Sequence, residues 1–152
     1  MSFTIRPFAA DDLDAAKQII AATDLFPADL LDDMVAPALA GSDEIWFVAE
    51  QGGVVGLAYA SPEPMTNGTW NALLLAVTPT LQGKGAGRAL MEHVEHTLTE
   101  RARILLVETS GKPEFEQTRG FYERIGYQRV ATIPSFYDVG DDKVVFWKSL
   151  AR

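Results

Sequence analysis

Val77-Thr78-Pro79-Thr80-Leu81-Gln82-Gly83-Lys84-Gly85-Ala86-Gly87-Arg88 is the stretch that decides the fold of this chain. It joins an apolar run at residues 73–77, which predicts a buried strand, to a helical pattern that starts at residue 89. A helix N-terminus has unpaired N–H groups and a partial positive charge, so it attracts phosphate. Glycine lets a phosphate approach the backbone closely. The stretch therefore predicts a strand–loop–helix unit that binds a phosphate-bearing cofactor.

The spacing of the glycines excludes two common phosphate loops. A dinucleotide-binding fingerprint needs a third glycine three residues after the second, and Arg88 or Leu90 stands there instead. A Walker loop needs Ser or Thr after its Gly-Lys pair, but Lys84 is followed by Gly85. The pattern Gln-x-x-Gly-x-Gly remains at residues 82–87. Taken alone, this pattern also fits a glycine-rich turn without any ligand.

Composition narrows the class of protein. The 152 residues predict one domain spanning 1–152 with a sizeable core, since 47% of them are hydrophobic. The chain has 13 basic and 21 acidic residues, and this net charge of −8 argues against a general nucleic-acid surface. It has no cysteine, no apolar run of membrane-spanning length and no signal peptide, so we expect a cytoplasmic protein that binds no membrane.

Periodicity and turn residues predict the order β-α-α-β-β-β-α-β-α-β-β. Asp11 is the expected N-cap of the first helix, whose apolar stripe is Leu13, Ala16 and Ile20. Gln51-Gly52-Gly53 predicts a tight hairpin, because glycine supplies the positive φ angles that such a turn needs. The strands are expected at 3–6, 45–50, 54–60, 70–77, 104–109, 127–133 and 143–150, and the later helices at 28–39, 85–101 and 115–125.

This order predicts an α/β (α+β) domain with a mixed, mostly antiparallel sheet of about seven strands. The strand 70–77, the helix 85–101 and the strand 104–109 form its parallel crossover unit. Ligands in such sheets favour the carboxyl ends of parallel strands, beside a helix N-terminus. The corner between residues 77 and 87 is therefore the expected binding site.

A second segment indicates which phosphate-bearing cofactor the chain binds: Phe121-Tyr122-Glu123-Arg124-Ile125-Gly126-Tyr127. Together with residues 82–87 and the order of the elements, it resembles the GNAT family of acyl-CoA-dependent N-acyltransferases. The chain departs from the family pattern at Phe115 and Thr118, where many members carry Asn and Ala. It also lacks the carboxylate that many members have on the fourth strand, here residues 70–77.

The resemblance implies roles for the cofactor-binding residues. The backbone N–H near Leu75 faces the thioester carbonyl, and Val77 bonds the pantetheine arm. The amides of the loop hold the pyrophosphate of acetyl-CoA, and Lys84 and Arg88 assist; Arg88 fits equally well as an ordinary exposed helix residue. The loop residues concerned are Gln82, Gly83, Lys84, Gly85, Ala86, Gly87 and Arg88.

Two side chains are candidates for proton transfer. The resemblance makes Tyr122 the general acid that protonates the leaving thiolate and a contact of the cofactor; the alternative is an aromatic residue packed at a helix end. Glu108 is the candidate general base, since it lies near the carboxyl end of the fifth strand. The alternative for Glu108 is a solvated carboxylate or an ion-pair partner of Arg103.

The acceptor is expected to meet the loops at 23–27 and 134–137. Phe26, Phe136 and Tyr137 are the candidate acceptor-lining residues, or they fill the edge of the core. No metal site is predicted, because the core face of the helix 85–101 runs through Leu90 and leaves His93 and His96 in solvent.

The sequence thus predicts an N-acetyltransferase that passes an acetyl group from acetyl-CoA to a primary amine of a small molecule or peptide by direct attack. A CoA-binding sensor or interaction module without catalysis is the alternative, because the fourth-strand carboxylate is missing. A homodimer is common in the family, and the sequence leaves the oligomeric state open.

Overall fold

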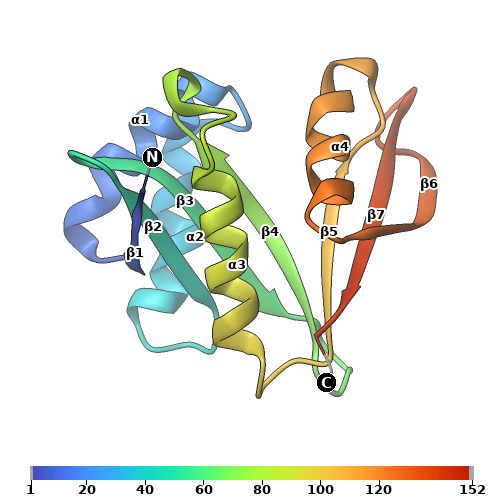
Figure 1. Ribbon diagram of the computed structural model, residues 1–152, viewed down its shortest axis with the longest axis horizontal. Helices are drawn as coiled ribbons and strands as arrows, with labels where there is room; N and C mark the ends of the chain where they lie inside the picture. The colour runs from blue at the N-terminus through green and yellow to red at the C-terminus, as the bar shows by residue number, and fades with distance from the viewer. Residues whose placement is uncertain (1, 151–152) are drawn as a thin grey trace. The chain divides into compact units, whose positions relative to one another are not determined.

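The computed structural model describes residues 2–150 and follows the predicted order of elements (Figure 1). Short 3-10 turns precede α1, α2, α3 and α4. The strands are β1 (Thr4–Pro7), β2 (Ile45–Glu50), β3 (Val54–Pro62), β4 (Thr69–Val77), β5 (Ile104–Ser110), β6 (Gln128–Asp138) and β7 (Asp141–Ser149). The helices are α1 (Leu13–Thr23), α2 (Leu31–Leu39), α3 (Ala86–Leu98) and α4 (Glu116–Arg124).

The strands are hydrogen-bonded in the order β1-β2-β3-β4-β5-β7-β6, as one seven-stranded sheet. β4 and β5 run parallel, joined by α3, because parallel neighbours need a crossover connection. β1–β2, β2–β3, β5–β7 and β6–β7 are antiparallel pairs. The predicted fold class is therefore confirmed. Within residues 2–150, no helix is long and apolar enough to cross a membrane.

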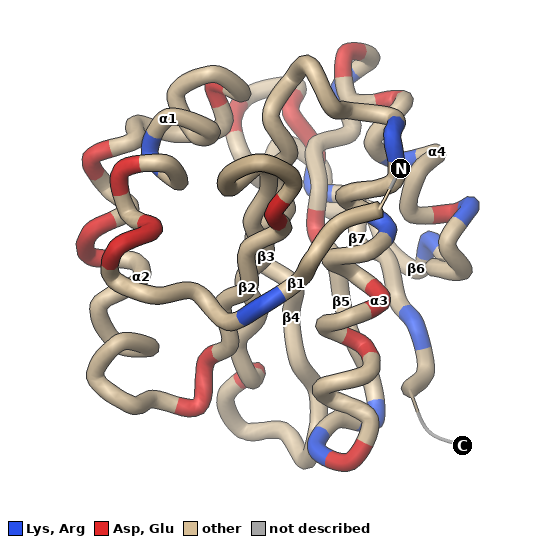
Figure 2. The backbone as a smooth tube through the Cα atoms, turned by 60° about the vertical axis from the view of Figure 1, so that its left-hand side comes forward, with Lys and Arg blue, Asp and Glu red and all other residues tan. Residues whose placement is uncertain are grey.

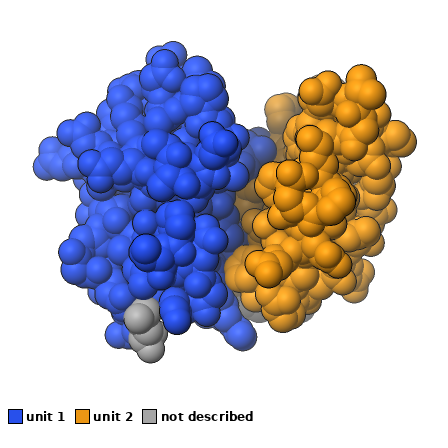
Figure 3. Space-filling view, turned by 90° about the horizontal axis from the view of Figure 1, so that it is seen from above, with its two compact units in different colours: residues 1–62, 73–97 blue, residues 63–72, 98–152 orange. Residues whose placement is uncertain are grey.

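The chain divides into two compact units, which Figure 3 colours separately. Unit 1 comprises residues 1–62 and 73–97, and unit 2 comprises residues 63–72 and 98–152. The boundary falls inside β4, so its residues 69–72 belong to unit 2 and its residues 73–77 to unit 1. The prediction of a single domain over 1–152 stays a prediction.

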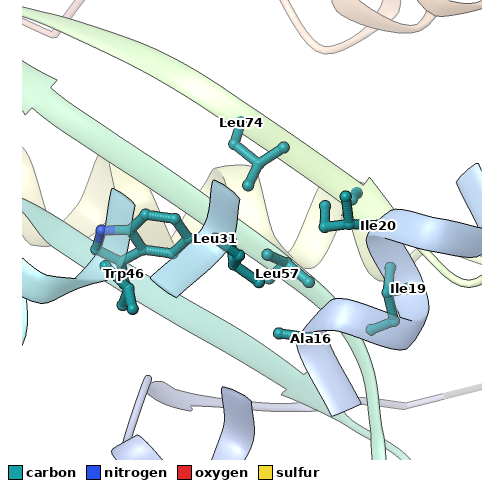
Figure 4. Close-up of a cluster of buried hydrophobic side chains, with 9 residues drawn as sticks. Ala16, Ile19, Ile20, Leu31, Trp46, Leu57 and Leu74 are labelled. Atoms are coloured by element: carbon teal, nitrogen blue, oxygen red, sulfur yellow. The ribbon is translucent and has the colours of Figure 1, made fainter. Parts of the chain in front are cut away.

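Unit 1 is built on an apolar core between α1, α2 and strands of the sheet (Figure 4). The expected stripe of α1 is confirmed, since Ala16 and Ile20 are fully buried and Leu13 packs against the core. Each buried methylene adds about 0.8 kcal/mol, which makes this cluster a main source of stability for unit 1. The cluster consists of Ala16, Ile19, Ile20, Leu31, Val35, Trp46, Leu57, Leu74 and Ala76.

The start of α1 differs from the prediction, because Asp12 and not Asp11 is the N-cap residue of α1, and its carboxylate caps the preceding 3-10 turn at residues 10–12 instead of the helix. The Asp12 carboxylate accepts the N–H of Ala9 at 2.8 Å and two hydrogen bonds from the Arg6 guanidinium at 2.8 Å each. Two adjacent aspartates make the cap ambiguous in the sequence, and the contacts of Asp12 with Arg6 and Ala9 distinguish them in the structure. The bonds from Arg6 lower the pKa of Asp12 below its ordinary 3.8 although burial opposes this. This stabilisation is therefore present above the unfolded pKa and lost as the pH falls through the lowered folded value.

The surface of α1 and α2 carries much of the negative charge of the chain (Figure 2). Seven aspartates and a single lysine, Lys17, lie between residues 11 and 33. Lys17 pairs with Asp32 at 2.6 Å, which links the two helices. The remaining acidic side chains account for most of the net charge of −8.

Unit 2 differs from the prediction at its edge strand. Residues 134–137 were expected to form a loop, but they belong to β6, which extends to Asp138. The register shifts between Ile133, which faces Lys143, and Asp138, which faces Asp141. Three extra residues on β6 are thus accommodated in a wide bulge, with Ser135 at φ +50°. Residues in a bulge do not alternate between apolar and polar side chains, so alternation could not predict the strand beyond residue 133.

The hairpin between β2 and β3 agrees with the prediction. Gly52 and Gly53 adopt φ angles of +68° and +137°, and the N–H of Gln51 donates to the carbonyl oxygen of Gly53 at 2.9 Å. β2 and β3 then pair antiparallel from Glu50 and Val54 outward.

Candidate active site

The glycine loop, residues 82–87, follows a single 3-10 turn that ends β4. The side-chain amide of Gln82 donates to the carbonyl oxygen of Val77 at 3.2 Å and so ties the loop to the end of the strand. Gly83 and Gly85 have φ angles of +76° and +101°, in the region where other residues are strained. The backbone here therefore requires glycine, and the sequence supplies it.

The start of α3 leaves several amides available to a ligand. The N–H of Ala89 donates to the carbonyl oxygen of Gly85 at 3.0 Å, so the N–H groups of Ala86, Gly87 and Arg88 precede the first such helical bond. A Cβ atom added at Gly83 would meet no described heavy atom within 4 Å, and at Gly85 it would meet only Phe3 at 4.0 Å. N–H groups that precede the first helical bond at a helix N-terminus, beside a loop with open space at Gly83, fit a pyrophosphate group.

The charged side chains of this loop are exposed to solvent. Arg88 pairs with Glu92 at 2.9 Å, and both side chains are about two-thirds exposed. Lys84 is exposed as well. On β4, Leu75 and Val77 are half-buried and alternate with Leu74 and Ala76, which belong to the unit 1 core. Leu75 and Val77 therefore face away from that core.

Tyr122 is the one residue of α4 that is buried, and aromatic rings surround it. Phe121, Tyr127 and Phe146 lie with their ring centroids 5.2, 5.9 and 5.8 Å from that of Tyr122. No hydrogen bond to the Tyr122 hydroxyl is found within residues 2–150. Burial raises the pKa of Tyr122, so the phenol keeps its proton at physiological pH. Such a group carries a proton that it can donate, and burial makes it a weaker acid than a solvated phenol.

Arg119 fixes the connection from β5 to α4. Its guanidinium donates to the carbonyl oxygens of Ser110 and Lys112 at 2.8 Å each. The Ser110 hydroxyl in turn accepts the N–H of Lys112 and donates to the Asp141 carboxylate. These contacts anchor the helix that carries Tyr122 to the end of β5.

Glu108 lies in a cluster of side chains around Lys143, a residue that the sequence reasoning missed. The carboxylate of Glu108 is 3.0 Å from Lys143 Nζ, and these side chains are 23% and 12% exposed. Arg103, the partner considered from the sequence, donates instead to the carbonyl oxygen of Asn67. Glu108 is thus neither fully solvated nor paired as expected, and only the register of β5 against β7 reveals its partner.

Two predicted acceptor residues join this cluster. Lys143 Nζ lies 3.7 Å from the centroid of the Phe136 ring, which is a cation–π contact. Burial raises the pKa of Tyr137, and the negative charges of Glu108 and Asp141 add to the effect. Unit 2 therefore brings Glu108, Phe136 and Tyr137 together around Lys143, which we call the Lys143 cluster. The β6 bulge places the two aromatic residues there, and half of each ring residue stays exposed.

The third predicted acceptor residue, Phe26, belongs to unit 1. It is half-buried and packs against the apolar core of that unit. This contact is the core-edge position that the sequence allowed, and an acceptor-lining role for Phe26 stays a prediction. His93 was expected in solvent but is half-buried, with its ring edge on Phe47 at 4.5 Å between centroids.

Asn71 is a further polar residue that sequence reasoning missed. It lies in β4, where its neighbours Trp70 and Ala72 are buried as well, and it is only 2% exposed. Its Nδ2 donates to the Glu63 carboxylate at 3.0 Å, and its Oδ1 has no partner within the described residues. The available signal was a polar side chain inside an otherwise apolar strand.

Comparison with known proteins gives consistent matches over the chain. Residues 42–129 match the family model described as the acetyltransferase (GNAT) domain. An uncharacterized N-acetyltransferase from Methanocaldococcus jannaschii is 28% identical over 145 residues, which cover 95% of this chain and 90% of that protein.

Solved structures agree with these sequence matches. A crystal structure from Desulfovibrio desulfuricans, assigned to the GNAT acetyltransferases, is 32% identical and superposes with a TM-score of 0.89, covering 99% of this chain and 100% of that one. A Salmonella typhimurium structure, described as an acetyltransferase with its cofactor acetyl-CoA, is 19% identical. It has a TM-score of 0.78 and covers 100% of this chain and 96% of that one, so it shows a shared fold.

Proposed function

The chain belongs to the GNAT family of acetyltransferases, and from this premise we propose that it transfers the acetyl group of acetyl-CoA to a primary amine of a small molecule or peptide. The observation that carries the proposal is the glycine loop. Its positive φ angles at Gly83 and Gly85 and the N–H groups at the start of α3, ahead of the first helical bond, suit the pyrophosphate of CoA. No nucleic acid, membrane or metal ion is needed for this reaction.

In this proposal the backbone of β4 and the glycine loop bind the cofactor. Residues Gln82, Gly83, Lys84, Gly85, Ala86, Gly87 and Arg88 hold the phosphates, mainly through main-chain N–H groups. Val77 bonds the pantetheine arm. The N–H of Leu75 donates to the oxygen of the thioester carbonyl as negative charge develops there; losing such a donor costs roughly 3–4 kcal/mol of barrier in enzymes that depend on it.

The chemical step joins the amine nitrogen to the acetyl carbon and breaks the bond from that carbon to sulfur. Glu108, directly or through water, takes the proton that the amine must lose. Tyr122 gives its phenolic proton to the departing thiolate. Because burial keeps this phenol protonated, the acid form is fully populated before the reaction. No covalent intermediate on the enzyme is required, and the chain has no cysteine to form one.

The acceptor side of the proposal rests on aromatic and charged groups. Phe136 and Tyr137 stand beside Glu108 in the Lys143 cluster, and Phe26 lies at the edge of the unit 1 core. Lys143 already pairs with the Glu108 carboxylate and lies over the Phe136 ring, so these two groups do not favour a cationic acceptor over an anionic one. The acceptor class we propose therefore stays a primary amine of a small molecule or peptide.

A second candidate is a CoA-binding module that does not catalyse transfer. It is favoured by the absence of a carboxylate from β4 and by the ion pair that already engages Glu108. In that case the chain would bind CoA through the glycine loop and signal or assemble without turnover.

Release of free thiol from acetyl-CoA over a panel of amines distinguishes these candidates. We expect turnover with at least one cationic primary amine, and a mass increase of that amine by one acetyl group. Binding of acetyl-CoA in calorimetry without turnover on small amines or peptide N-termini would favour the module. Failure to bind acetyl-CoA would overturn both candidates.

The remaining expectations concern the protein as a whole. We propose that residues 1–152 act as a single domain in the cytoplasm, as the length and the absence of cysteine predict. We propose a homodimer because homodimers are common in the family. Analytical ultracentrifugation of the purified chain, which measures its mass in solution, tests this.

A further inference from the structure

We propose that Asn71 receives the acceptor nitrogen and that Glu63 holds Asn71 in the orientation this requires. The inference rests on the proposed function and deepens it, since it assigns a residue that selects primary amines. Asn71 would act as a positioning residue for the nucleophile, in a chain whose fourth strand has no carboxylate of its own.

The first observation is an unsatisfied buried atom. Within residues 2–150, two buried side-chain polar atoms lack a hydrogen-bond partner: Nε1 of Trp46 in the unit 1 core and Oδ1 of Asn71. Asn71 as a whole is 98% buried. Buried amide oxygens are almost always hydrogen-bonded, so Oδ1 is expected to meet a donor in the working protein.

The second observation fixes which atom of the amide is unpaired. When ionised, the Glu63 carboxylate has no proton to donate and can only accept hydrogen bonds. The Asn71 atom that contacts it at 3.0 Å must then be the NH₂ group. The other atom of the side chain is then the carbonyl oxygen. What it lacks is a hydrogen-bond donor, such as the N–H of an amine or a water molecule.

The backbone holds Glu63 in place to do this. Its N–H donates to the carbonyl oxygen of Thr69 at 2.8 Å, which closes the turn that leads from β3 into β4. Glu63 therefore delivers a carboxylate to the fourth strand from the preceding turn. Its oxygen orients the amide instead of acting on the ligand directly.

The third observation is the register of β4 and β5. Asn71 faces Leu106 across the parallel pair, and Glu108 lies two residues farther along β5. Side chains alternate along a strand, so Asn71 and Glu108 belong to the same face of the sheet. Strand spacing puts their Cα atoms about 8 Å apart, within reach of a single nitrogen between the two side chains.

This arrangement suits the geometry of a nucleophilic primary amine. Once neutral, such a nitrogen has one lone pair and two N–H groups. The lone pair attacks the thioester carbon, one N–H donates through a bridging water to Asn71 Oδ1, and the other faces the Glu108 carboxylate. A secondary amine has only one N–H and must leave one of the two oxygens unpaired. An amide oxygen cannot take the proton, so Asn71 orients the amine and Glu108 removes the proton.

The test compares three substitutions by steady-state kinetics with a primary amine and its N-methyl analogue. Asn71→Leu keeps the size of the side chain and removes both polar groups. We expect kcat/KM for the primary amine to fall at least tenfold and its preference over the N-methyl analogue to shrink, while the Kd of acetyl-CoA stays unchanged. Glu63→Gln still offers the Asn71 NH₂ group an acceptor and should retain activity, whereas Glu63→Leu should lose part of it. Unchanged amine selectivity in Asn71→Leu would overturn the proposal.

A second measurement does not depend on turnover. In ¹⁵N-labelled wild-type protein, the side-chain NH₂ signals of Asn71 are identified by their loss in Asn71→Leu. Adding the primary amine to the CoA complex should shift these signals, and adding its quaternary trimethylammonium analogue, which carries no N–H, should not. If wild-type protein turns over no amine, the proposed function fails, and a shift with the primary amine would still support Asn71 as its binding residue. If the chemical shifts of these signals stay unchanged with every amine, Oδ1 binds only water, and the inference would then be wrong.

Discussion

The glycine loop in unit 1 and the polar groups of unit 2 offer a ligand different parts of the chain, the backbone in the first and side chains in the second. The loop offers main-chain N–H groups, set by two glycines with positive φ angles and by the start of α3. Unit 2 offers side chains, namely the Glu63–Asn71 pair and the Lys143 cluster, which come from β4, β5, β6 and β7 and the turn before β4.

The difference separates what the family shares from what this chain adds. A backbone site binds the phosphate of any acyl-CoA and tolerates exchange of its side chains, provided that glycine stays where φ requires it. A side-chain site can distinguish one acceptor from another, because each buried polar group must find a partner of the right kind. We therefore expect substitutions in unit 2 to change turnover and selectivity, and substitutions in the loop to change cofactor affinity.

The largest effect is expected at Tyr122. Tyr122→Phe removes the proposed acid and keeps the buried ring, so kcat should fall by about 10²–10⁴-fold while the Kd of acetyl-CoA stays within a factor of about two. Stopped-flow turnover and calorimetry measure the two quantities. Tyr127→Phe is the matched control, since it removes a hydroxyl from a neighbouring buried ring. Equal losses of kcat in both variants would assign the effect to packing.

Glu108 should give the next largest effect. Glu108→Gln should lower kcat/KM for the amine by roughly 10²-fold, because no carboxylate is left to take the proton. The substitution also breaks a mostly buried ion pair and is expected to cost stability.

Lys143→Met separates these two consequences of changing Glu108. It breaks the same ion pair and keeps the carboxylate, so it should lower the melting temperature and largely retain kcat/KM for the amine. If Lys143→Met lowers kcat/KM as much as Glu108→Gln does, the pair is structural and Glu108 is not the base.

The same contrast explains how much the sequence could predict. The order of elements, the hairpin at Gly52 and the glycine loop follow from local signals, namely alternation, helical periodicity and glycines at turns. Asp12 as the cap, the β6 bulge and the partner of Glu108 depend on residues that meet only after folding. Arg6 contacts Asp12 from six residues away, and Lys143 reaches Glu108 through the β5–β7 register. The proposed cofactor site is thus local in the sequence, whereas the proposed acceptor site is not.

A smaller effect is expected at Gly83 and tests whether backbone conformation carries cofactor binding. Alanine at φ +76° costs roughly 1–2 kcal/mol, and the exposed loop can relax to avoid this until the cofactor binds. The Kd of acetyl-CoA in Gly83→Ala should therefore rise about tenfold, with kcat at saturation nearly unchanged. Gly52→Ala places the same strain, at φ +68°, in the β2–β3 hairpin of the same unit. It should lower stability and leave the Kd as it is.

The smallest effect is expected at Arg88, and it decides whether the loop works through backbone or charge. The Arg88–Glu92 pair is exposed and adds at most about 0.5 kcal/mol, and alanine favours a helix, so Arg88→Ala should hardly change the melting temperature. A surface charge near the pyrophosphate is largely screened by salt. The Kd of acetyl-CoA should therefore rise only about two- to fivefold at low ionic strength, and this difference should vanish in about 0.5 M salt.

Glu92→Gln should give a small change in the opposite direction, because it releases Arg88. A rise of 30-fold or more that persists in high salt would mean that a guanidinium, not the amides of α3, holds the phosphate. The contrast between a backbone-built and a side-chain-built site would then no longer hold.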